Sequence, residues 1–312
     1  MSQPQLGVAI HGAGWVGGAH AASWQRLATA QIISISDVNL ERAGQLAARL
    51  GLDCAVRDKY EQVLADPRVD VVDITGPSHV HAEQAIAAAE AGKHVHVEKP
   101  IALTVEENRR LRDAVLRAGV KSQAGFVVRF SPEVQLLKSL VEKGTVGDIF
   151  YAELDYWHTI RPTHHAWNLH SRRATGGSAM LLGGCHALDA MRFLVGDEVV
   201  EVTAYGNNQR GNFEYDANVV AVFRFRGGAI GKTAALFDAA MPYQFNIDLV
   251  GTEGTLRDNR IWSPRLLPGQ TGWATVPTIM LDTPDVNHHP FDAELGYFAD
   301  CILNDRQSHC SV

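Results

Sequence analysis

The sequence has no excess of positive charge. Its 28 Lys and Arg residues are outnumbered by 35 Asp and Glu residues, which leaves a formal net charge of −7. This balance argues against a nucleic acid or an anionic membrane surface as the main partner. It leaves an anionic cofactor open, because backbone amides and helix dipoles can hold phosphates without charged side chains.

Cysteine is also scarce, and long apolar runs are missing. The four cysteines show neither disulfide nor zinc-site spacing: Cys54, Cys185, Cys301 and Cys310. We therefore expect reduced thiols in a cytoplasmic protein. The chain starts without a basic region, and no apolar stretch is long enough to span a bilayer, so we expect neither a signal peptide nor a membrane partner.

Alternating strand and helix patterns fill the first part of the chain. Short apolar runs that fit buried strands are followed by helical stretches, several of which end at a glycine suited to a helix C-cap, such as Gly51 and Gly119. The expected strands are 6–11, 32–36, 69–75, 95–98 and 120–126, and the expected helices are 19–28, 40–50, 81–91 and 105–118. This alternation predicts an α/β Rossmann domain with a doubly wound parallel sheet over residues 1–124.

The pattern changes after about residue 129. One helix is expected over 132–142, and alternating segments then fit strands at 149–156, 199–205, 217–225, 229–237 and 245–250. Successive strands separated by turns favour antiparallel pairing. We therefore expect residues 125–312 to form an α+β domain with a large open, mainly antiparallel sheet.

A glycine-rich motif follows the first expected strand. Gly12, Gly14 and Gly17 form G-x-G-x-x-G, with Trp15 and Val16 inside it. A motif that follows a strand and opens a helix has the context of a dinucleotide-binding loop. Gly12 permits the tight turn, Gly14 lets the backbone approach the pyrophosphate, and Gly17 lets helix and strand pack closely. The helix N-terminus then faces the phosphate charge.

An acidic residue ends the second expected strand. Asp37 lies twenty residues after Gly17, where a carboxylate can accept hydrogen bonds from the adenosine ribose hydroxyls. The same carboxylate would repel a 2′-phosphate, so the sequence favours NAD over NADP. Arg42 lies a little further on and could soften that preference.

A lysine lies at the end of the fourth expected strand. The segment Glu98-Lys99-Pro100 stands at the carboxyl edge, where α/β sheets bind their ligands. Lys99 could donate to a substrate hydroxyl and stabilise the alkoxide that forms as hydride leaves. Pro100 fixes the turn and is a candidate for a cis peptide bond. The alternative is a solvated lysine at a strand end.

A glycine-rich segment in the second half leads into a helix that carries His186. A histidine near its ordinary pKa is the usual general base for an alcohol proton. Asp189 lies one turn later, within reach of His186 on the same helix. The alternative is a histidine that is satisfied within the core.

The stretch 157–170 is rich in histidine and aromatic residues. It holds His158, His164, His165, Trp167 and His170. Zinc is conceivable because imidazoles are common zinc ligands, but no pairing on one helix supports it, and we expect no metal. A polar, aromatic loop that faces a sugar fits better, with His165 and Trp167 as candidate substrate contacts.

Taken together, five segments resemble the Gfo/Idh/MocA family, the glucose–fructose oxidoreductase and inositol dehydrogenase superfamily. The resemblance covers essentially the whole chain and is specific for the family rather than for a substrate. It rests on Gly12-x-Gly14-x-x-Gly17-x-x-His20, Thr75-Gly76-Pro77-Ser78-His79-Val80-His81, Gly92-Lys93-His94-x-x-x-Glu98-Lys99-Pro100, Gly125-Phe126-x-x-Arg129-Phe130-x-Pro132, and the helix from Gly176-Gly177 to His186-x-x-Asp189.

The resemblance implies a dehydrogenase or reductase that transfers hydride between NAD and a secondary alcohol or ketone of a sugar, sugar derivative or cyclitol. It implies that the second domain binds substrate and forms the face of a homodimer or homotetramer. Lys99 and His186 would be catalytic and would flank the substrate carbon, with Asp189 as a further substrate residue. The loop 75–81 and the strand end at Lys99 would lie along the cofactor, through Thr75, Pro77, His79, His81 and Glu98.

One position departs from the family pattern. Many dehydrogenases of the family have an Asp four residues before the catalytic histidine, where this chain has Leu182. Leucine cannot bind a hydroxyl or assist proton transfer, so substrate recognition must differ. Two alternatives therefore stay open: a glycosidase that keeps NAD bound, and a non-catalytic regulator that senses the dinucleotide. The presence of both Lys99 and His186 favours an enzyme.

Overall fold

The chain folds into two compact units. The computed structural model describes residues 5–164, 166–281 and 289–312. The first unit comprises Met1–Phe126 and Phe291–Val312, and the second comprises Val127–Pro290. The change after Phe126 lies close to the domain boundary expected at 124/125. The last segment differs from expectation, because it joins the first unit and buries Leu295 and Phe298 there.

The first unit contains a parallel sheet of six strands in the order β3-β2-β1-β4-β5-β6. The strands are β1 (Leu6–His11), β2 (Ala30–Ser36), β3 (Ala55–Arg57), β4 (Val71–Ile74), β5 (His94–Glu98) and β6 (Ser122–Gly125). The chain runs outwards from β1 to β3 and then crosses to β4 on the other side of β1. This order confirms the doubly wound Rossmann sheet and places its switch point between β1 and β4.

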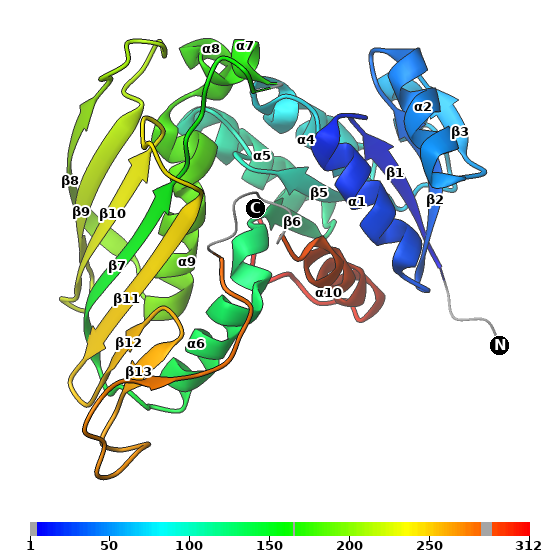
Figure 1. Cartoon of the computed structure of the whole chain (residues 1–312). Coiled ribbons are helices and arrows are strands. Elements are labelled where there is room, and N and C mark those ends of the chain that lie inside the picture. The colour runs from blue at the N-terminus through cyan, green and yellow to red at the C-terminus, as the bar shows by residue number, and fades with distance from the viewer. Residues whose placement is uncertain (1–4, 165, 282–288) are drawn as a thin grey trace. The chain divides into compact units, whose positions relative to one another are not determined.

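Helices cover both faces of this sheet (Figure 1). They are α1 (Trp15–Arg26), α2 (Leu40–Leu50), α3 (Tyr60–Leu64), α4 (His81–Glu90), α5 (Val105–Ala118) and α10 (Phe291–Leu303). Helices α4 and α5 pack together over one face, and α1 and α10 pack together over the other. A short 3₁₀ turn, η1 (Ser78–Val80), precedes α4.

Two features of the first unit differ from the sequence prediction. Helix α1 begins at Trp15 rather than at residue 19, because Gly14 is its N-cap and the glycine-rich loop leads directly into the helix. Strand β3 and helix α3 were not expected. Both are short, and Ala55–Arg57 contains no fully buried residue that would mark an apolar run.

The second unit contains a sheet of eight strands in the order β14-β13-β12-β11-β7-β10-β9-β8. Its pairs are antiparallel except that of β7 with β10, which confirms a mainly antiparallel sheet. The strands are β7 (Ile149–Trp157), β8 (Val199–Asn207), β9 (Asn218–Phe225), β10 (Ile230–Leu236), β11 (Gln244–Gly251), β12 (Thr255–Arg257), β13 (Arg260–Trp262) and β14 (Ala274–Thr275).

The second unit has several helices, and α9 among them lies against one face of its sheet (Figure 1). They are α6 (Pro132–Glu142), α7 (Trp167–His170), α8 (Arg173–Gly176) and α9 (Cys185–Val195), with a 3₁₀ turn η2 (Val127–Phe130) and a π-helical turn η3 (Met180–Gly184). The segment η3–α9 packs on β7 and β10. Its close approach depends on Gly183, where a Cβ atom would lie 2.5 Å from the Tyr156 ring.

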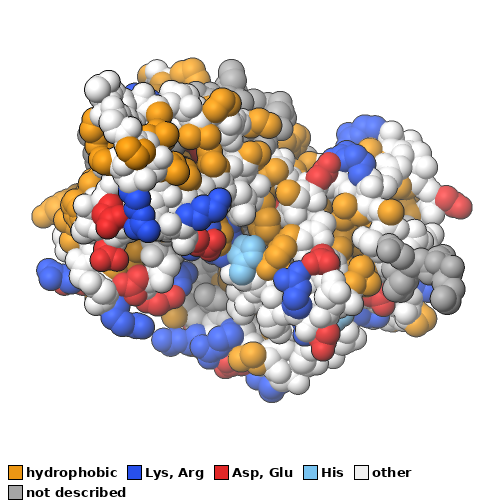
Figure 2. Space-filling view, turned by 90° about the horizontal axis from the view of Figure 1, so that it is seen from below, with side chains coloured by type: hydrophobic (Ala, Val, Ile, Leu, Met, Phe, Trp, Pro, Cys, Tyr) orange, Lys and Arg blue, Asp and Glu red, His pale blue; other side chains and the backbone are white. Residues whose placement is uncertain are grey.

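The surface carries charges of both signs. On the face shown in Figure 2, Lys and Arg side chains are interspersed with Asp and Glu side chains. Several form ion pairs, such as Arg192 with Glu198. Among the described residues, no helix combines the length and the apolarity needed to cross a lipid bilayer.

Candidate cofactor and catalytic residues

Four of the expected site residues lie at one edge of the first sheet. Gly12, Asp37, Thr75 and Lys99 each come immediately after a strand, namely β1, β2, β4 and β5. These strands are parallel and adjacent in the order β2-β1-β4-β5. Their carboxyl ends therefore meet at the same edge, where open α/β sheets bind ligands.

The glycine-rich loop has the backbone that a dinucleotide site requires. Gly12 has a φ of 111°, which other residues rarely adopt. A Cβ atom at Gly17 would lie 1.9 Å from the Gly12 carbonyl oxygen, so only glycine lets α1 approach β1 this closely. At Gly14 an added Cβ would meet no protein atom within 4 Å, so the chain's own packing does not explain this glycine. Trp15 is exposed and Val16 is half-buried at the start of α1.

Asp37 is held against the glycine-rich loop. One carboxylate oxygen accepts a hydrogen bond from the backbone N–H of Ala13 at 2.8 Å, and the other accepts from the N–H of Asn39 at 2.8 Å. The guanidinium of Arg42 lies 3.7 Å from the carboxylate and is largely exposed. Asp37 is thus a fixed, negatively charged group beside the loop, with Arg42 at its outer side.

The loop after β4 is tied to both neighbouring strands. The Thr75 hydroxyl donates to the Gly12 carbonyl oxygen at 2.8 Å. The His81 ring is buried and lies between two carbonyl oxygens, that of Gly76 and that of Pro100, each 2.8 Å away. His81 therefore braces the loop against the turn after Lys99. Among the other loop residues, Pro77 and His79 are exposed.

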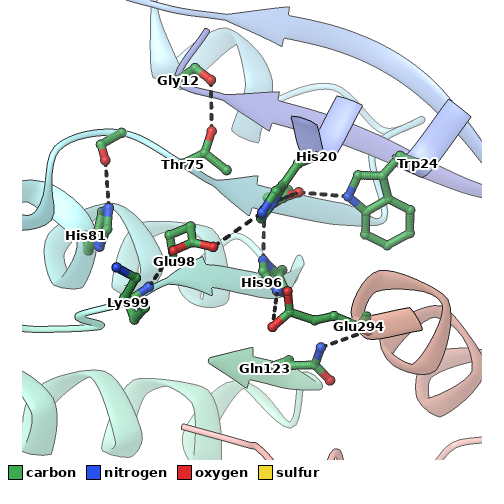
Figure 3. Close-up of polar contacts among 12 residues, drawn as sticks. Gly12, His20, Trp24, Thr75, His81, His96, Glu98, Lys99, Gln123 and Glu294 are labelled. Atoms are coloured by element: carbon green, nitrogen blue, oxygen red, sulfur yellow. Dashed lines mark hydrogen bonds and ion pairs between the residues drawn. The ribbon is translucent and has the colours of Figure 1, made fainter. Parts of the chain in front are cut away.

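Lys99 is half-buried and precedes a cis peptide bond to Pro100, as expected. Glu98, the residue before it, points into the unit rather than to its surface. One Glu98 oxygen accepts a hydrogen bond from the Lys99 backbone N–H at 3.1 Å, and the other lies 3.3 Å from His20 Nε2 (Figure 3). Burial would raise the pKa of Glu98, but the hydrogen bond and charge of His20 keep it below its ordinary value. Glu98 is thus an ionised carboxylate directly beneath Lys99.

In the second unit, His186 lies in the first turn of α9 and is buried. The Tyr156 ring, from β7, stacks against it with a centroid distance of 6.1 Å. The His289 ring lies 5.9 Å away on another side. His289 is half-buried and belongs to this cluster.

Asp189 pairs with a residue from another element. Its carboxylate forms a buried bidentate ion pair with the guanidinium of Arg129, with Nε to Oδ2 at 2.9 Å. The substrate contact expected of Asp189 stays a prediction. Leu182, at the position where many dehydrogenases of the resembled family have Asp, is buried in the π-helical turn η3.

Comparisons with known proteins identify the family to which the chain belongs. Residues 6–126 match the model of an oxidoreductase family with an NAD-binding Rossmann fold, and residues 134–257 match the model of the GFO/IDH/MocA C-terminal domain. The chain belongs to the Gfo/Idh/MocA family. It is therefore an oxidoreductase with NAD as its cofactor, and the resemblance stated from the sequence is confirmed.

Several Gfo/Idh/MocA relatives have named activities. A levoglucosan dehydrogenase of Pseudarthrobacter phenanthrenivorans is 30% identical over 285 residues, which cover 80% of this chain and 73% of the relative. A scyllo-inositol 2-dehydrogenase (NAD(+)) of Bacillus subtilis is 29% identical and covers 96% and 87%. Among solved structures, a levoglucosan dehydrogenase in complex with NADH and L-sorbose is 26% identical, with a TM-score of 0.89 and coverage of 99% and 92%.

NAD fits the residues at the cofactor edge, by which we mean the carboxyl ends of β2, β1, β4 and β5. The open space at Gly14 leaves room for a pyrophosphate against the backbone, and the N-terminus of α1 supplies amide donors. The fixed carboxylate of Asp37 suits the ribose hydroxyls of NAD and disfavours a 2′-phosphate.

The stretch 157–170 shows no grouping of metal ligands among its described residues. His165 lies outside the residues that the structure describes. Trp167 is half-buried and packs edge-on against the Phe213 ring at 4.9 Å. His158 accepts or donates a hydrogen bond with the Tyr156 hydroxyl at 3.1 Å. In the described part of the chain, three potential ligands come together only in the first unit, as His20–Asp73–His96 and His20–Glu98–Glu294.

Three of these buried polar residues of the first unit were not expected from the sequence: Asp73, His96 and Glu294. Asp73 and His96 lie in central strands of a parallel sheet, whose residues are usually apolar on both faces. The signal was the strict alternation His94-Val95-His96-Val97-Glu98 in β5. Glu294 could not be found in this way, because it comes from α10, nearly two hundred residues later in the chain.

Proposed function

We propose that this chain transfers hydride between NAD and a secondary alcohol or ketone of a sugar, sugar derivative or cyclitol, with Lys99 and His186 as its catalytic residues. The observation that carries the proposal is the shared sheet edge. The glycine-rich loop, Asp37, Thr75 and Lys99 follow four adjacent parallel strands. A lysine at that edge is next to the cofactor loop rather than at an arbitrary point of the surface.

NAD, when bound, accepts or supplies the hydride. The residues that would hold it are those of the glycine-rich loop, Asp37 and the loop that starts at Thr75. Lys99 would donate a hydrogen bond to the substrate oxygen and stabilise the negative charge that develops there during alcohol oxidation. His186 would take the hydroxyl proton and return it in the reverse direction.

Two observations support a polyhydroxylated substrate. Levoglucosan and inositol dehydrogenases are among the relatives, and one solved relative binds L-sorbose. Around His186 the second unit gathers aromatic rings with polar tips, including Tyr156, His158 and Tyr243. Such rings bind the apolar faces and the hydroxyls of sugars. The Leu182 side chain has no polar group, so we expect a substrate that differs from those of relatives with Asp at this position.

The test is NAD reduction by the purified protein against a panel of aldoses, anhydrosugars, cyclitols and glycosides, with NADP in parallel. We expect turnover with NAD on at least one polyol class. Lys99→Ala and His186→Ala should each lower kcat by roughly 10²- to 10⁴-fold, the range of a lost acid–base or oxyanion contact. Lys143→Ala, which removes an exposed lysine after α6, is the matched control and should leave kcat unchanged.

Two results would contradict the proposal. Full turnover in Lys99→Ala would remove this lysine from the reaction. NAD binding without reduction on any alcohol would favour the alternatives, which the same panel separates: release of a sugar from a glycoside without net NADH indicates the NAD-retaining glycosidase, and no reaction at all indicates the regulator.

We also propose that copies of the chain associate through the open face of the second sheet. Exposed apolar side chains lie on neighbouring strands of this face: Tyr205 in β8, Val220 and Val222 in β9, and Ile230 in β10. Contiguous exposed apolar residues of this kind mark association surfaces. Light scattering should give the mass of a dimer or tetramer, and Val222→Glu should reduce it. A monomeric wild-type protein would contradict this proposal.

A further inference from the structure

A sealed polar cluster lies between the first sheet and helices α1 and α10. At its centre the Asp73 carboxylate, in β4, accepts three hydrogen bonds: from Trp24 Nε1 at 2.8 Å, from His20 Nδ1 at 2.9 Å and from His96 Nδ1 at 2.9 Å. All four side chains are inaccessible to solvent. Burying a carboxylate this deeply requires compensating donors, and Asp73 has them on every side.

Each histidine of the cluster faces a second carboxyl group with its other nitrogen (Figure 3). His20 Nε2 lies 3.3 Å from Glu98, and His96 Nε2 lies 3.9 Å from Glu294. The five groups therefore form one chain: Glu98, His20, Asp73, His96 and Glu294. It begins next to Lys99 at the end of β5 and finishes in α10.

The distances between ring nitrogens and carboxylate oxygens indicate how His20 and His96 are protonated. A neutral imidazole has one N–H and one lone pair, so it can satisfy only one of two carboxylates. His20 Nδ1 donates to Asp73 and Nε2 faces Glu98 at 3.3 Å, so the imidazolium is the form of His20 that attracts both carboxylates. His96 donates to Asp73 in the same way and faces Glu294 at a longer distance.

Charge balance then assigns the remaining proton to Glu294. Two imidazolium ions balance two carboxylates, and a third buried negative charge would be unmatched. Neither Glu294 carboxyl oxygen has a hydrogen-bond partner among the described residues, whereas Asp73 and Glu98 accept hydrogen bonds from N–H donors. Burial raises the pKa of Glu294, in agreement with a neutral carboxylic acid.

The chain connects to the reaction through Glu98. This carboxylate is clamped from three sides: His20 on one oxygen, the Lys99 N–H on the other, and the backbone of β6. At Gly125 in β6, an added Cβ atom would lie 2.9 Å from Glu98 Oε1, so the glycine is what lets the strand close over the carboxylate. The position of the Lys99 backbone therefore depends on a Glu98 that stays ionised and in place.

We infer that Glu98, His20, Asp73 and His96 are positioning residues for Lys99: the buried ion chain holds Glu98 as a fixed anion, which orients the end of β5 and keeps a negative charge beside the Lys99 ammonium. This inference rests on the proposed function, in which the Lys99 ammonium stabilises the substrate oxygen. The groups that face Glu98 and His20 are His96 from β5, Lys99 directly after β5, Asp73 from β4, Trp24 from α1 and Glu294 from α10.

The first measurement reads the protonation states without any reaction. The full-length protein, labelled with ¹⁵N-histidine, would be examined by long-range ¹H–¹⁵N NMR, with His20→Gln and His96→Gln to assign the signals. Both rings should be imidazolium at pH 7. A neutral tautomer at His20 would overturn the inference. So would one equivalent of zinc in the purified protein by elemental analysis, because a metal would replace the protons of the chain.

The second measurement compares isosteric carboxyl-to-amide variants in NAD-dependent turnover. Glu98→Gln and Asp73→Asn each remove a buried negative charge, and we expect kcat to fall by roughly 10- to 100-fold, with the Kd for NAD changed far less. Glu294→Gln replaces a neutral acid by a neutral amide and should keep kcat within about twofold. A merely structural role would not rank the three variants by charge.

The pH dependence of kcat tests the expected direction of the change in the pKa of Glu98. In Asp73→Asn the two imidazolium ions lose their shared anion, so His20 becomes neutral more readily and Glu98 loses its cation. The pKa of Glu98 should rise, and the acid limb of kcat should move to higher pH. An unchanged profile in Asp73→Asn and Glu98→Gln, with turnover still dependent on Lys99, would overturn the inference alone. Turnover that does not depend on Lys99 would overturn the proposed function instead.

Discussion

The two faces of the Rossmann sheet are equally buried and chemically opposite. Toward α4 and α5, strands β4 and β5 present Val72, Ile74, Val95 and Val97 to an apolar core. Toward α1 and α10, the alternate residues of the same strands belong to the ion chain that runs from Glu98 to Glu294. Burial by itself therefore does not say how a region is held together. The apolar face is stabilised by the removal of apolar area from water. The other face is stabilised by hydrogen bonds and ion pairs between buried side chains.

The largest loss of stability should come from removing Asp73, the central carboxylate of the ionic face, which is the side of the sheet toward α1 and α10. Asp73→Ala leaves two buried histidines without their shared anion and Trp24 without its acceptor. Removing one partner of a buried ion network typically costs about 3–5 kcal/mol. Urea denaturation should show this loss at pH 7. A loss below about 1 kcal/mol would mean that the charges are not paired as described.

The second effect is a dependence of stability on pH that belongs to the ionic face alone. Burial would lower the pKa of His96, but Asp73 outweighs it and raises this pKa to about 9. In the same way Asp73 raises the pKa of His20 well above its usual value. Groups with raised pKa values stabilise the fold fully below their unfolded pKa, near 6.5, and lose this contribution as pH rises through the folded pKa.

We therefore expect the free energy of unfolding to fall by roughly 1–3 kcal/mol between pH 7 and pH 10. The carboxylates of Asp73 and Glu98 have the opposite sign. Their pKa values are lowered, so their contribution is present above about pH 4 and is lost as pH falls through the folded pKa. Equilibrium denaturation from about pH 3 to about pH 10 gives both limbs, and a flat alkaline limb would contradict the assignment of the imidazolium ions.

The third prediction concerns the stability of the apolar face of the sheet, toward α4 and α5. Ile74→Val removes one buried methylene group beside the α4–α5 core and should cost about 0.5–1.5 kcal/mol. Because no charge changes, the loss should be the same at pH 6 and pH 9. A loss that varies with pH would show that the two faces are coupled through the strands.

The smallest effect on stability is expected at an exposed ion pair between α1 and α10. Arg26 of α1 forms an ion pair with Asp292 of α10, with Nε to Oδ2 at 2.9 Å, and both side chains are more than half exposed. Exposed pairs contribute at most about 1 kcal/mol, so Arg26→Ala should change stability by less than that. Sodium chloride at high concentration should remove most of the difference, since exposed pairs are screened and the buried chain is not.

The cofactor edge could be predicted because its signals are local. The glycine spacing, Asp37 at the end of one strand and Lys99 at the end of another are each visible within a few residues, and parallel strands bring their ends to one edge. The role of Asp189 could not be judged in this way. It lies one helical turn from His186, but its partner is Arg129, sixty residues earlier in the chain.

The sequence alone predicted the family, the alternation that builds the Rossmann sheet, the mainly antiparallel second sheet and the polar residues and glycines that follow β1, β2, β4 and β5 at one sheet edge. Only the tertiary structure decided that residues from Phe291 onwards return to the first unit and that Glu294 faces His96 in the buried polar cluster. The reason is physical. Periodicity and turn chemistry act between neighbours along the chain, whereas the pairing of buried charges is settled by which side chains meet once water has been excluded.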